Sequence, residues 1–349
     1  MELSELGEFA LIDRLTADFN TRVPSTILGV GDDASVLTAP EAEQELLVST
    51  DMFLEGVHFD LVYVPLKHLG FKAVSANVSD IVAMGGVAEQ ITVSVGVSAR
   101  FKVEDLEALY GGIHEACEVY GVDLIGGDTT ASVTGLTISV TVIGRVPKGK
   151  AIRRSGAQLH DLLCVSGNIG AAYMGLTLCE REKVAFNGSP DFTPRFEGRE
   201  YILQRLLRPY ARVDVWAALQ QAGVTPTAMI DVSDGLSSEV LHIAKASGVG
   251  ILLYEDKIPI DTETILMAEE VNIPPLTAAL HGGEDYELLF TVPLGLKDVV
   301  ETVPDVSIIG HTTNDTTDCY LVTRGGQQIP LTAQGFEHMQ SKETDFIAS

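Results

Sequence analysis

Residues 229–235 read MIDVSDG, an apolar run that ends in two aspartates three positions apart. The apolar residues predict a buried strand, and the serine and glycine behind them predict a turn into a helix. Like charges at such a place repel each other unless something offsets them. Asp231 and Asp234 are therefore candidate cation ligands, although a lone aspartate after a strand is more often a turn residue or a helix cap.

The same arrangement recurs along the chain. Apolar runs also lead into Asp32 and Asp33, and others end in Asp51, Asp80 and Asp128. Carboxylates gathered in one pocket need a counter-charge, and Mg²⁺ prefers a few carboxylates together with substrate phosphates. The repetition predicts an acidic pocket that binds a phosphate ligand through metal ions; the alternative is a set of independent caps.

Composition narrows the classes of protein to consider. The chain has 349 residues and a net charge of −26, which disfavours nucleic acid as a partner. Its four cysteines show no metal-type spacing, which predicts reduced, buried thiols and a cytoplasmic protein. The first ten residues lack the features of a signal peptide, and no run approaches the roughly 18 apolar residues that span a bilayer. We therefore expect a soluble protein with no membrane partner.

The order of elements predicts an α/β (α+β) fold with two domains. Strand and helix patterns alternate, and apolar residues at three- and four-residue steps predict a helix over 103–121 that ends at a glycine. A proline- and glycine-containing basic stretch at 145–157 suggests a boundary, whereas 183–200 reads as polar and irregular. The predicted units are an N-terminal domain of residues 1–148, a C-terminal domain of 149–340 and a tail of 341–349.

Two nucleotide-binding motifs are matched in residue pattern, but not in the context that each motif requires. Residues 29–34, GVGDDA, fit a dinucleotide fingerprint, but a strand-like stretch follows them and two aspartates would face a pyrophosphate. Residues 144–151, GRVPKGKA, fall one residue short of a P-loop, with Ala151 in place of the Ser or Thr that binds Mg²⁺. We interpret the first as part of the acidic pocket and the second as a basic turn between domains.

Few positive residues accompany the aspartates. Arg153 and Arg154 follow the predicted boundary and could reach a nucleotide phosphate or lie in a solvated linker. His58 could touch an anionic substrate or simply pack. Residues 281–290, HGGEDYELLF, place Glu284 after paired glycines, as a turn into a strand also would.

With these residues assembled, the chain resembles the thiamine-monophosphate kinase family of the aminoimidazole ribonucleotide synthetase-like ATP-binding superfamily. The resemblance covers nearly the whole chain. It rests on the motifs GVGDDA, STDMFLEGVHF, ANVSDIVAMGG, LIGGDTT, RSGA, IDVSDGL and GGEDYELLF, in this order.

The resemblance implies an N-terminal domain whose strands form a shared barrel in a homodimer, followed by a larger α/β domain. It also implies that the γ-phosphate of ATP passes directly to thiamine phosphate, giving thiamine diphosphate and ADP, with several Mg²⁺ ions bound. The implied magnesium ligands are Asp33, Ser49, Thr50, Asp51, Asp80, Asp128, Asp231 and Asp234. The implied ATP contacts are Tyr120, Gly127, Asp128, Arg154 and Ser233, and the implied thiamine phosphate contacts are His58, Glu284 and Phe336.

No residue is expected to act as a nucleophile or general base, because the attacking phosphate oxygen is already anionic at neutral pH. Two alternatives remain at this point. One is an ATP-dependent ligase like aminoimidazole ribonucleotide synthetase, and the other is a non-catalytic nucleotide-binding protein on the same scaffold. The motifs GGEDYE and EGVHF argue against the first.

Overall fold

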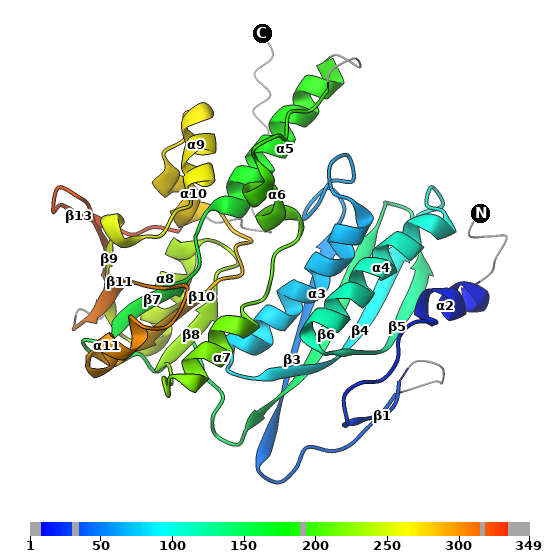
Figure 1. Cartoon of the computed structure of the whole chain (residues 1–349), viewed down its shortest axis with the longest axis horizontal. Helices are drawn as coiled ribbons and strands as arrows, with labels where there is room; N and C mark the ends of the chain where they lie inside the picture. The colour runs from blue at the N-terminus through cyan, green and yellow to red at the C-terminus, as the bar shows by residue number, and fades with distance from the viewer. Residues whose placement is uncertain (1–7, 30–34, 189–192, 315–317, 334–349) are drawn as a thin grey trace.

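The computed structural model describes residues 8–29, 35–188, 193–314 and 318–333. The N-terminal part is built on a four-stranded sheet (Figure 1). Its order is β3 (Gln44–Leu54), β6 (Thr137–Pro147), β4 (Val87–Val97) and β5 (Asp123–Ala131). The β4–β5 pair is parallel and the other two pairs are antiparallel.

Two long helices cover one face of this sheet (Figure 1): α3 (Leu66–Ala83) and α4 (Val103–Tyr120). The helix predicted over 103–121 is confirmed, with Gly121 in the left-handed conformation as its C-cap. The helices approach closely, because a Cβ on Gly112 would lie 1.8 Å from the carbonyl oxygen of Lys67. The shorter elements of this part are α2 (Glu8–Thr16), β1 (Thr26–Leu28) and β2 (Val36–Leu37).

Alternation along β3 gives its two faces different roles. Ser49, Asp51 and Phe53 face α3, and Phe53 is buried there. Val48 and Met52 point away from the helices and are 64% and 55% exposed. The sheet therefore has one face against helices and one open face.

The C-terminal part contains a seven-stranded mixed sheet in the order β13-β12-β9-β11-β7-β10-β8. Its strands are β7 (Leu162–Ser166), β8 (Ala228–Asp231), β9 (Gly250–Tyr254), β10 (Leu288–Val292), β11 (Val306–Thr313), β12 (Cys319–Val322) and β13 (Gln328–Pro330). Helix α3 of the N-terminal part contacts the edge strand β8. An edge strand is thus covered by a helix of the other part.

The helices of this part are α5 (Ala171–Gly188), α6 (Glu200–Leu207), α7 (Val213–Gln221), α8 (Leu236–Ser247), α9 (Thr262–Glu270), α10 (Pro275–His281) and α11 (Lys297–Val300), with 3₁₀ turns η1 (Glu255–Lys257) and η2 (Leu294–Leu296). The prediction of an irregular segment over 183–200 was wrong at its start, because α5 continues to Gly188. Its polar residues are held by ion pairs; Lys183, for example, lies 2.6 Å from Asp60.

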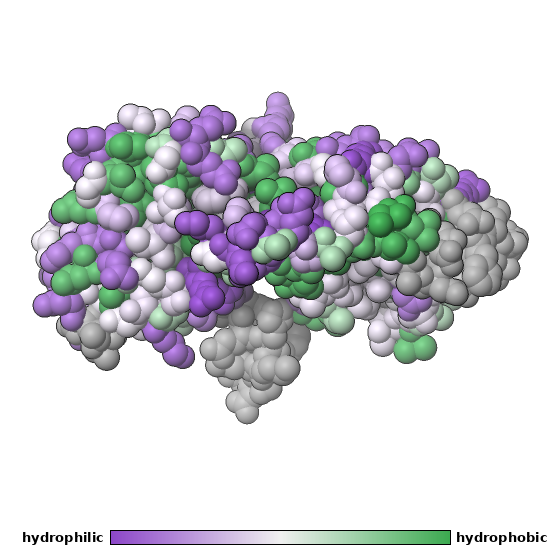
Figure 2. All heavy atoms as spheres, turned by 90° about the horizontal axis from the view of Figure 1, so that it is seen from below, coloured by the Kyte–Doolittle hydropathy of each residue, from purple (hydrophilic) through white to green (hydrophobic). Residues whose placement is uncertain are grey.

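Outside the core, hydrophilic and hydrophobic residues are interspersed over the face seen from below, with hydrophilic residues gathered near its middle (Figure 2). All four cysteines are free and buried, as their spacing predicted. The N-terminal sheet ends at Pro147, but the boundary at 148/149 stays a prediction. Among the helices of the described ranges, none combines the length and the apolar composition that a bilayer crossing requires.

Candidate functional site

Three of the singled-out aspartates meet where the two parts of the chain touch. Asp51 comes from β3, Asp80 from α3 and Asp231 from the end of β8. The Ser49 hydroxyl donates a hydrogen bond of 2.5 Å to Asp80, and the Ser79 hydroxyl donates one of 2.7 Å to Asp231. The meeting of strand β3, helix α3 and strand β8 therefore gathers carboxylates that are far apart in sequence.

The electrostatics of these carboxylates show that they lack enough counter-charge. Burial raises the pKa of Asp51 to about 6, and the charge of Asp80 adds to the effect. Burial likewise raises the pKa of Asp80 and of Asp231, and for Asp231 the charges of Asp80 and Asp51 raise it further. Such a cluster favours binding of cations, because a cation lets all three groups ionise.

Arg154, Asp234 and Glu239 border this cluster. The positive charge of the exposed Arg154 opposes the rise in the pKa of Asp80, so Arg154 lies close enough to act on the carboxylates. Asp234 is exposed in the loop after β8, and its backbone amide donates to Glu239 across 3.0 Å. Burial raises the pKa of Glu239 to about 8. Glu239 was not predicted from the sequence. It could have been found as an acidic residue in the first turn of the helix that follows the two aspartates.

The loop over residues 282–287 closes the other side of the site. Its backbone is pinned to the loop after β8, since the Glu284 amide donates to Ser233 O across 2.7 Å. Glu284 and Tyr286 have φ angles of 64° and 52°, in the left-handed region that favours glycine. Strain of this kind persists where surrounding contacts enforce it, and it often marks functional sites. Glu284 Oε1 also lies 2.8 Å from the ammonium nitrogen of Lys72 in α3.

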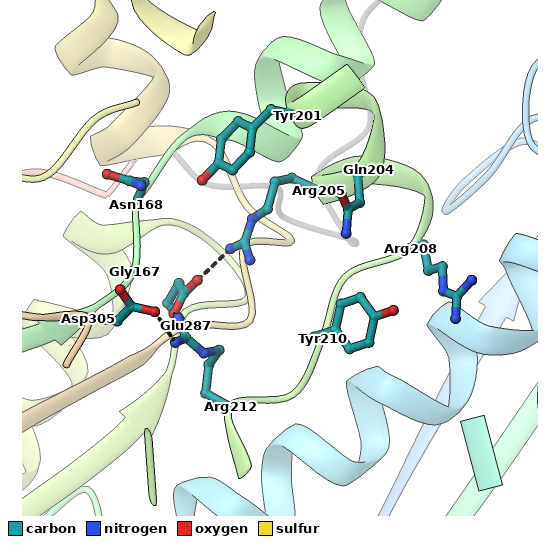
Figure 3. A pocket seen from close by; sticks show the side chains of 10 residues that line it. All are labelled: Gly167, Asn168, Tyr201, Gln204, Arg205, Arg208, Tyr210, Arg212, Glu287 and Asp305. Atoms are coloured by element: carbon teal, nitrogen blue, oxygen red, sulfur yellow. Dashed lines mark hydrogen bonds and ion pairs between the residues drawn. The ribbon is translucent and has the colours of Figure 1, made fainter. Parts of the chain in front are cut away.

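A cavity of about 300 Å³ lies behind this loop (Figure 3). Arg205 and Arg212 point toward the buried carboxylate of Glu287, at 2.8 Å and 2.6 Å (Figure 3). Arg205 also donates to the carbonyl of Asp285. Because each guanidinium already has a carboxylate partner, the cavity is a weak match for an anion. We interpret the ion pairs that line the cavity as contacts that hold the loop over residues 282–287 in place. Its walls are formed by Gly167, Asn168, Tyr201, Gln204, Arg205, Arg208, Tyr210, Arg212, Glu287 and Asp305.

Two singled-out residues lie on the open face of the N-terminal sheet. The Thr50 hydroxyl donates to the carbonyl of Val140 at 3.1 Å and is exposed. Asp128 is exposed on β5, and its neighbour Thr129 bonds to Tyr110 of α4 on the covered face. Alternation therefore directs Asp128 away from Asp51. A Cβ on Gly127 would lie 1.8 Å from the carbonyl oxygen of Val93 on the neighbouring strand β4.

Two further candidates occupy other places. The Tyr120 hydroxyl lies 2.8 Å from Ser75 Oγ and accepts a hydrogen bond from the Ala211 amide at 3.0 Å, in the contact between the two parts. His58 Nδ1 accepts from the Leu54 amide at 3.0 Å, just beyond β3. Asp33 and Phe336 lie outside the described residues.

The oxygen donors fit a hard cation, although they do not form a closed cage. Among the described residues, no three His, Cys, Asp or Glu side chains are placed so that they could hold a metal ion. Mg²⁺ commonly uses one or two carboxylates and completes its shell with water and substrate phosphates. The cluster is therefore suited to a cation that arrives with a phosphate ligand.

The chain is similar to several known proteins. Residues 31–146 match the family model of the AIR synthase related protein, N-terminal domain. The thiamine-monophosphate kinase of Aquifex aeolicus is 37% identical over 295 residues, which cover 84% of this chain and 88% of that protein. The solved structure of AaThiL complexed with AMPPCP and TMP superposes with a TM-score of 0.74 at 33% identity, covering 97% of this chain and 99% of that one.

The crystal structure of thiamine-monophosphate kinase from Stenotrophomonas maltophilia has a TM-score of 0.77 at 32% identity. It is matched over 93% of this chain and 98% of that one. The two-part mixed α/β fold is thus the fold of aminoimidazole ribonucleotide synthetase-like proteins, as predicted. Identity above 30% over most of both chains, together with the shared fold, shows that the chain belongs to the thiamine-monophosphate kinase family.

Proposed function

We propose that this chain transfers the γ-phosphate of ATP to thiamine phosphate, giving thiamine diphosphate and ADP. Family membership supports the reaction, as does a relative's structure that holds AMPPCP and TMP together. The observation that carries the proposal is the meeting of Asp51, Asp80 and Asp231 at the contact between the two parts. Phosphoryl transfer depends mainly on positioning and on charge neutralisation, which such a site supplies.

We infer that Mg²⁺ is the cation of this cluster, held by Ser49, Asp51, Asp80, Asp231 and Asp234. Their oxygen atoms suit Mg²⁺, and the raised pKa values of the buried members indicate missing positive charge. When bound, the ions would neutralise phosphate charge. Three more proposed ligands, Asp33, Thr50 and Asp128, would have to act from outside the described cluster.

The chain's own residues would bind and orient the two substrates. Arg154 and Ser233, beside the cluster, are proposed to contact ATP together with Tyr120, Gly127 and Asp128. For thiamine phosphate the proposed contacts are His58, Glu284 and Phe336. The attacking oxygen belongs to a phosphate that is already anionic, so a protein base is not needed to remove a proton. What the residues supply is an in-line arrangement of two anions that would otherwise repel each other.

We also propose a homodimer formed through the open face of the N-terminal sheet, as a barrel shared by two copies. Leu46, Val48 and Met52 leave that face partly apolar, with exposures of 47%, 64% and 55%. Pairing two such faces would cover these side chains. Thr50 and Asp128 would then lie at or near the interface. Four buried, free cysteines are in keeping with a cytoplasmic protein.

One assay separates this function from its alternatives. ADP release is measured with ATP and Mg²⁺ and one of three acceptors: thiamine phosphate, unphosphorylated thiamine or an aminoimidazole precursor. Of the three acceptors, we expect only thiamine phosphate to support turnover. Turnover with the aminoimidazole precursor would identify a ligase instead, and ATP binding without turnover on any acceptor would identify a nucleotide-binding protein.

A further inference from the structure

We infer that Lys72 is a positioning residue for thiamine phosphate, and that it acts by fixing the carboxylate of Glu284. Lys72 lies in the middle of α3, where the side chain is 5% exposed and Nζ is 2.8 Å from Glu284 Oε1. The pair joins a helix of the N-terminal part to a loop of the C-terminal part. The inference rests on the proposed function, in which Glu284 contacts thiamine phosphate.

A buried ammonium group is costly, so its retention calls for a reason. Removing a lysine from water has a penalty that an apolar residue of similar length would avoid. Within the described ranges, Glu284 is the one carboxylate at ion-pair distance from Lys72. The remainder of α3 is mostly apolar or small and buried. The lysine therefore serves Glu284 rather than the packing of the helix.

Glu284 needs a positively charged partner because other carboxylates lie near it. Burial raises the pKa of the neighbouring Tyr286, and the charges of Glu284, Asp51, Asp231 and Asp80 raise it further. Glu284 therefore shares its surroundings with the aspartate cluster, and their like charges repel. The ammonium of Lys72 offsets that repulsion. It contacts Oε1, while Oε2 has no partner among the described residues and the side chain remains 30% exposed.

Helix α3 holds a second site residue on the same face. Ser79 donates to Asp231 across 2.7 Å, and it lies seven residues after Lys72. Seven residues are two helical turns, roughly 10 Å along the axis. The helix thereby fixes the separation between Asp231, at the phosphate-transfer end, and Glu284, at the proposed acceptor-binding end. Lys72 thus sets how the acceptor is aligned with the phosphate groups.

The test compares Lys72→Met with Lys67→Met in steady-state kinetics. Methionine keeps an unbranched side chain without the charge, and Lys67 offers a control on the same helix, because it pairs with Glu115 at 3.2 Å and is 60% exposed. We expect Lys72→Met to raise KM for thiamine phosphate by about 10- to 100-fold, with KM for ATP changed less than about 3-fold. Lys67→Met should match the wild type, and Lys72→Arg should recover part of the loss.

A double-mutant cycle identifies the residue through which Lys72 acts. With Glu284→Gln already in place, Lys72→Met should add little further loss, because the carboxylate it serves is gone. Lys72→Gln provides the same comparison if Lys72→Met does not fold. Full additivity, or equal rises in KM for ATP and thiamine phosphate, would overturn the inference. A wild-type enzyme inactive on thiamine phosphate would overturn the proposed function and this inference with it.

Discussion

At the scale of single residues, the direction of a side chain on β3 decides its chemistry. Asp51 faces α3 and the carboxylates of Asp80 and Asp231, whereas Thr50 faces the open side of the sheet. Because successive side chains of a strand point to opposite faces of the sheet, these two residues lie on different faces although they are adjacent in sequence. Of the residues of β3, Asp51 therefore has the most direct role in the site.

Asp51→Asn should lower turnover by at least about 100-fold, because it removes an anionic cation ligand and almost no volume. The fold should survive, since the substitution also relieves repulsion by Asp80. Turnover and thermal unfolding, measured on the same preparation, check both parts. Near-normal activity, or a variant that fails to fold, would refute the role given to Asp51.

Asp285 allows a test of pH dependence away from the proposed metal ligands. Burial raises the pKa of this carboxyl to about 7, against the opposing effects of Arg205 and of its bond to the Gly170 amide. Because the folded-state pKa lies above the unfolded value of about 3.9, its contribution to stability is complete below about pH 4. That contribution is lost as the pH rises through about 7.

Relative to Asp285→Asn, the wild type should lose at least about 1 kcal/mol of unfolding free energy between about pH 4 and about pH 8. Subtracting the variant's curve removes the contributions of the other titratable groups, which the two proteins share. Urea unfolding at several pH values gives both curves, and parallel curves would contradict the raised pKa.

At the scale of elements, the contact between α3 and α4 fixes the helix that carries Lys72, Ser79 and Asp80. A Cβ added at Gly112 would lie 1.8 Å from Lys67 O, whereas nothing lies within 4 Å of one added at Gly111. The adjacent glycines of α4 therefore differ in packing: a side chain at 111 would have room, whereas one at 112 would clash with the backbone of α3.

Gly112→Ala should lower the unfolding free energy by about 1–3 kcal/mol, because backbone must move to admit the methyl group. Gly111→Ala should raise it by roughly 0.5–1 kcal/mol, because alanine loses less chain entropy in a helix. Chemical denaturation of the two variants measures both. Equal effects would mean that α3 and α4 do not pack backbone against backbone.

Elements and site residues were predictable to different degrees. The strong periodicity of 103–121 and its terminal glycine located α4, and apolar runs ending in aspartate located Asp51, Asp80 and Asp231. The end of α5 was missed, because polar residues there are held by ion pairs between distant segments. Lys72 was missed for a related reason: its role depends on a partner more than 200 positions away.

At the scale of the whole molecule, the proposed dimer would form through the open face of the N-terminal sheet. Val48, 64% exposed on that face, should lie inside the proposed interface, whereas Val133, fully exposed in a turn, should not. Val48→Glu should weaken dimerisation at least about 10-fold by burying a charge, while Val133→Glu should leave it unchanged. Sedimentation over a range of protein concentrations measures this. A monomeric wild type, or a Val48→Glu variant that dimerises normally, would refute the interface.

The proposed reaction moves the γ-phosphoryl group of ATP to thiamine phosphate, with both anions bound where the two parts of the chain meet. The most direct measurement follows ATP whose γ-phosphate carries heavy oxygen, incubated with Mg²⁺, thiamine phosphate and the wild-type protein, by mass spectrometry. We expect the label in the terminal phosphate of thiamine diphosphate, and we expect the Asp51→Asn variant to leave it in ATP. Label released as inorganic phosphate, with no labelled thiamine diphosphate, would contradict it.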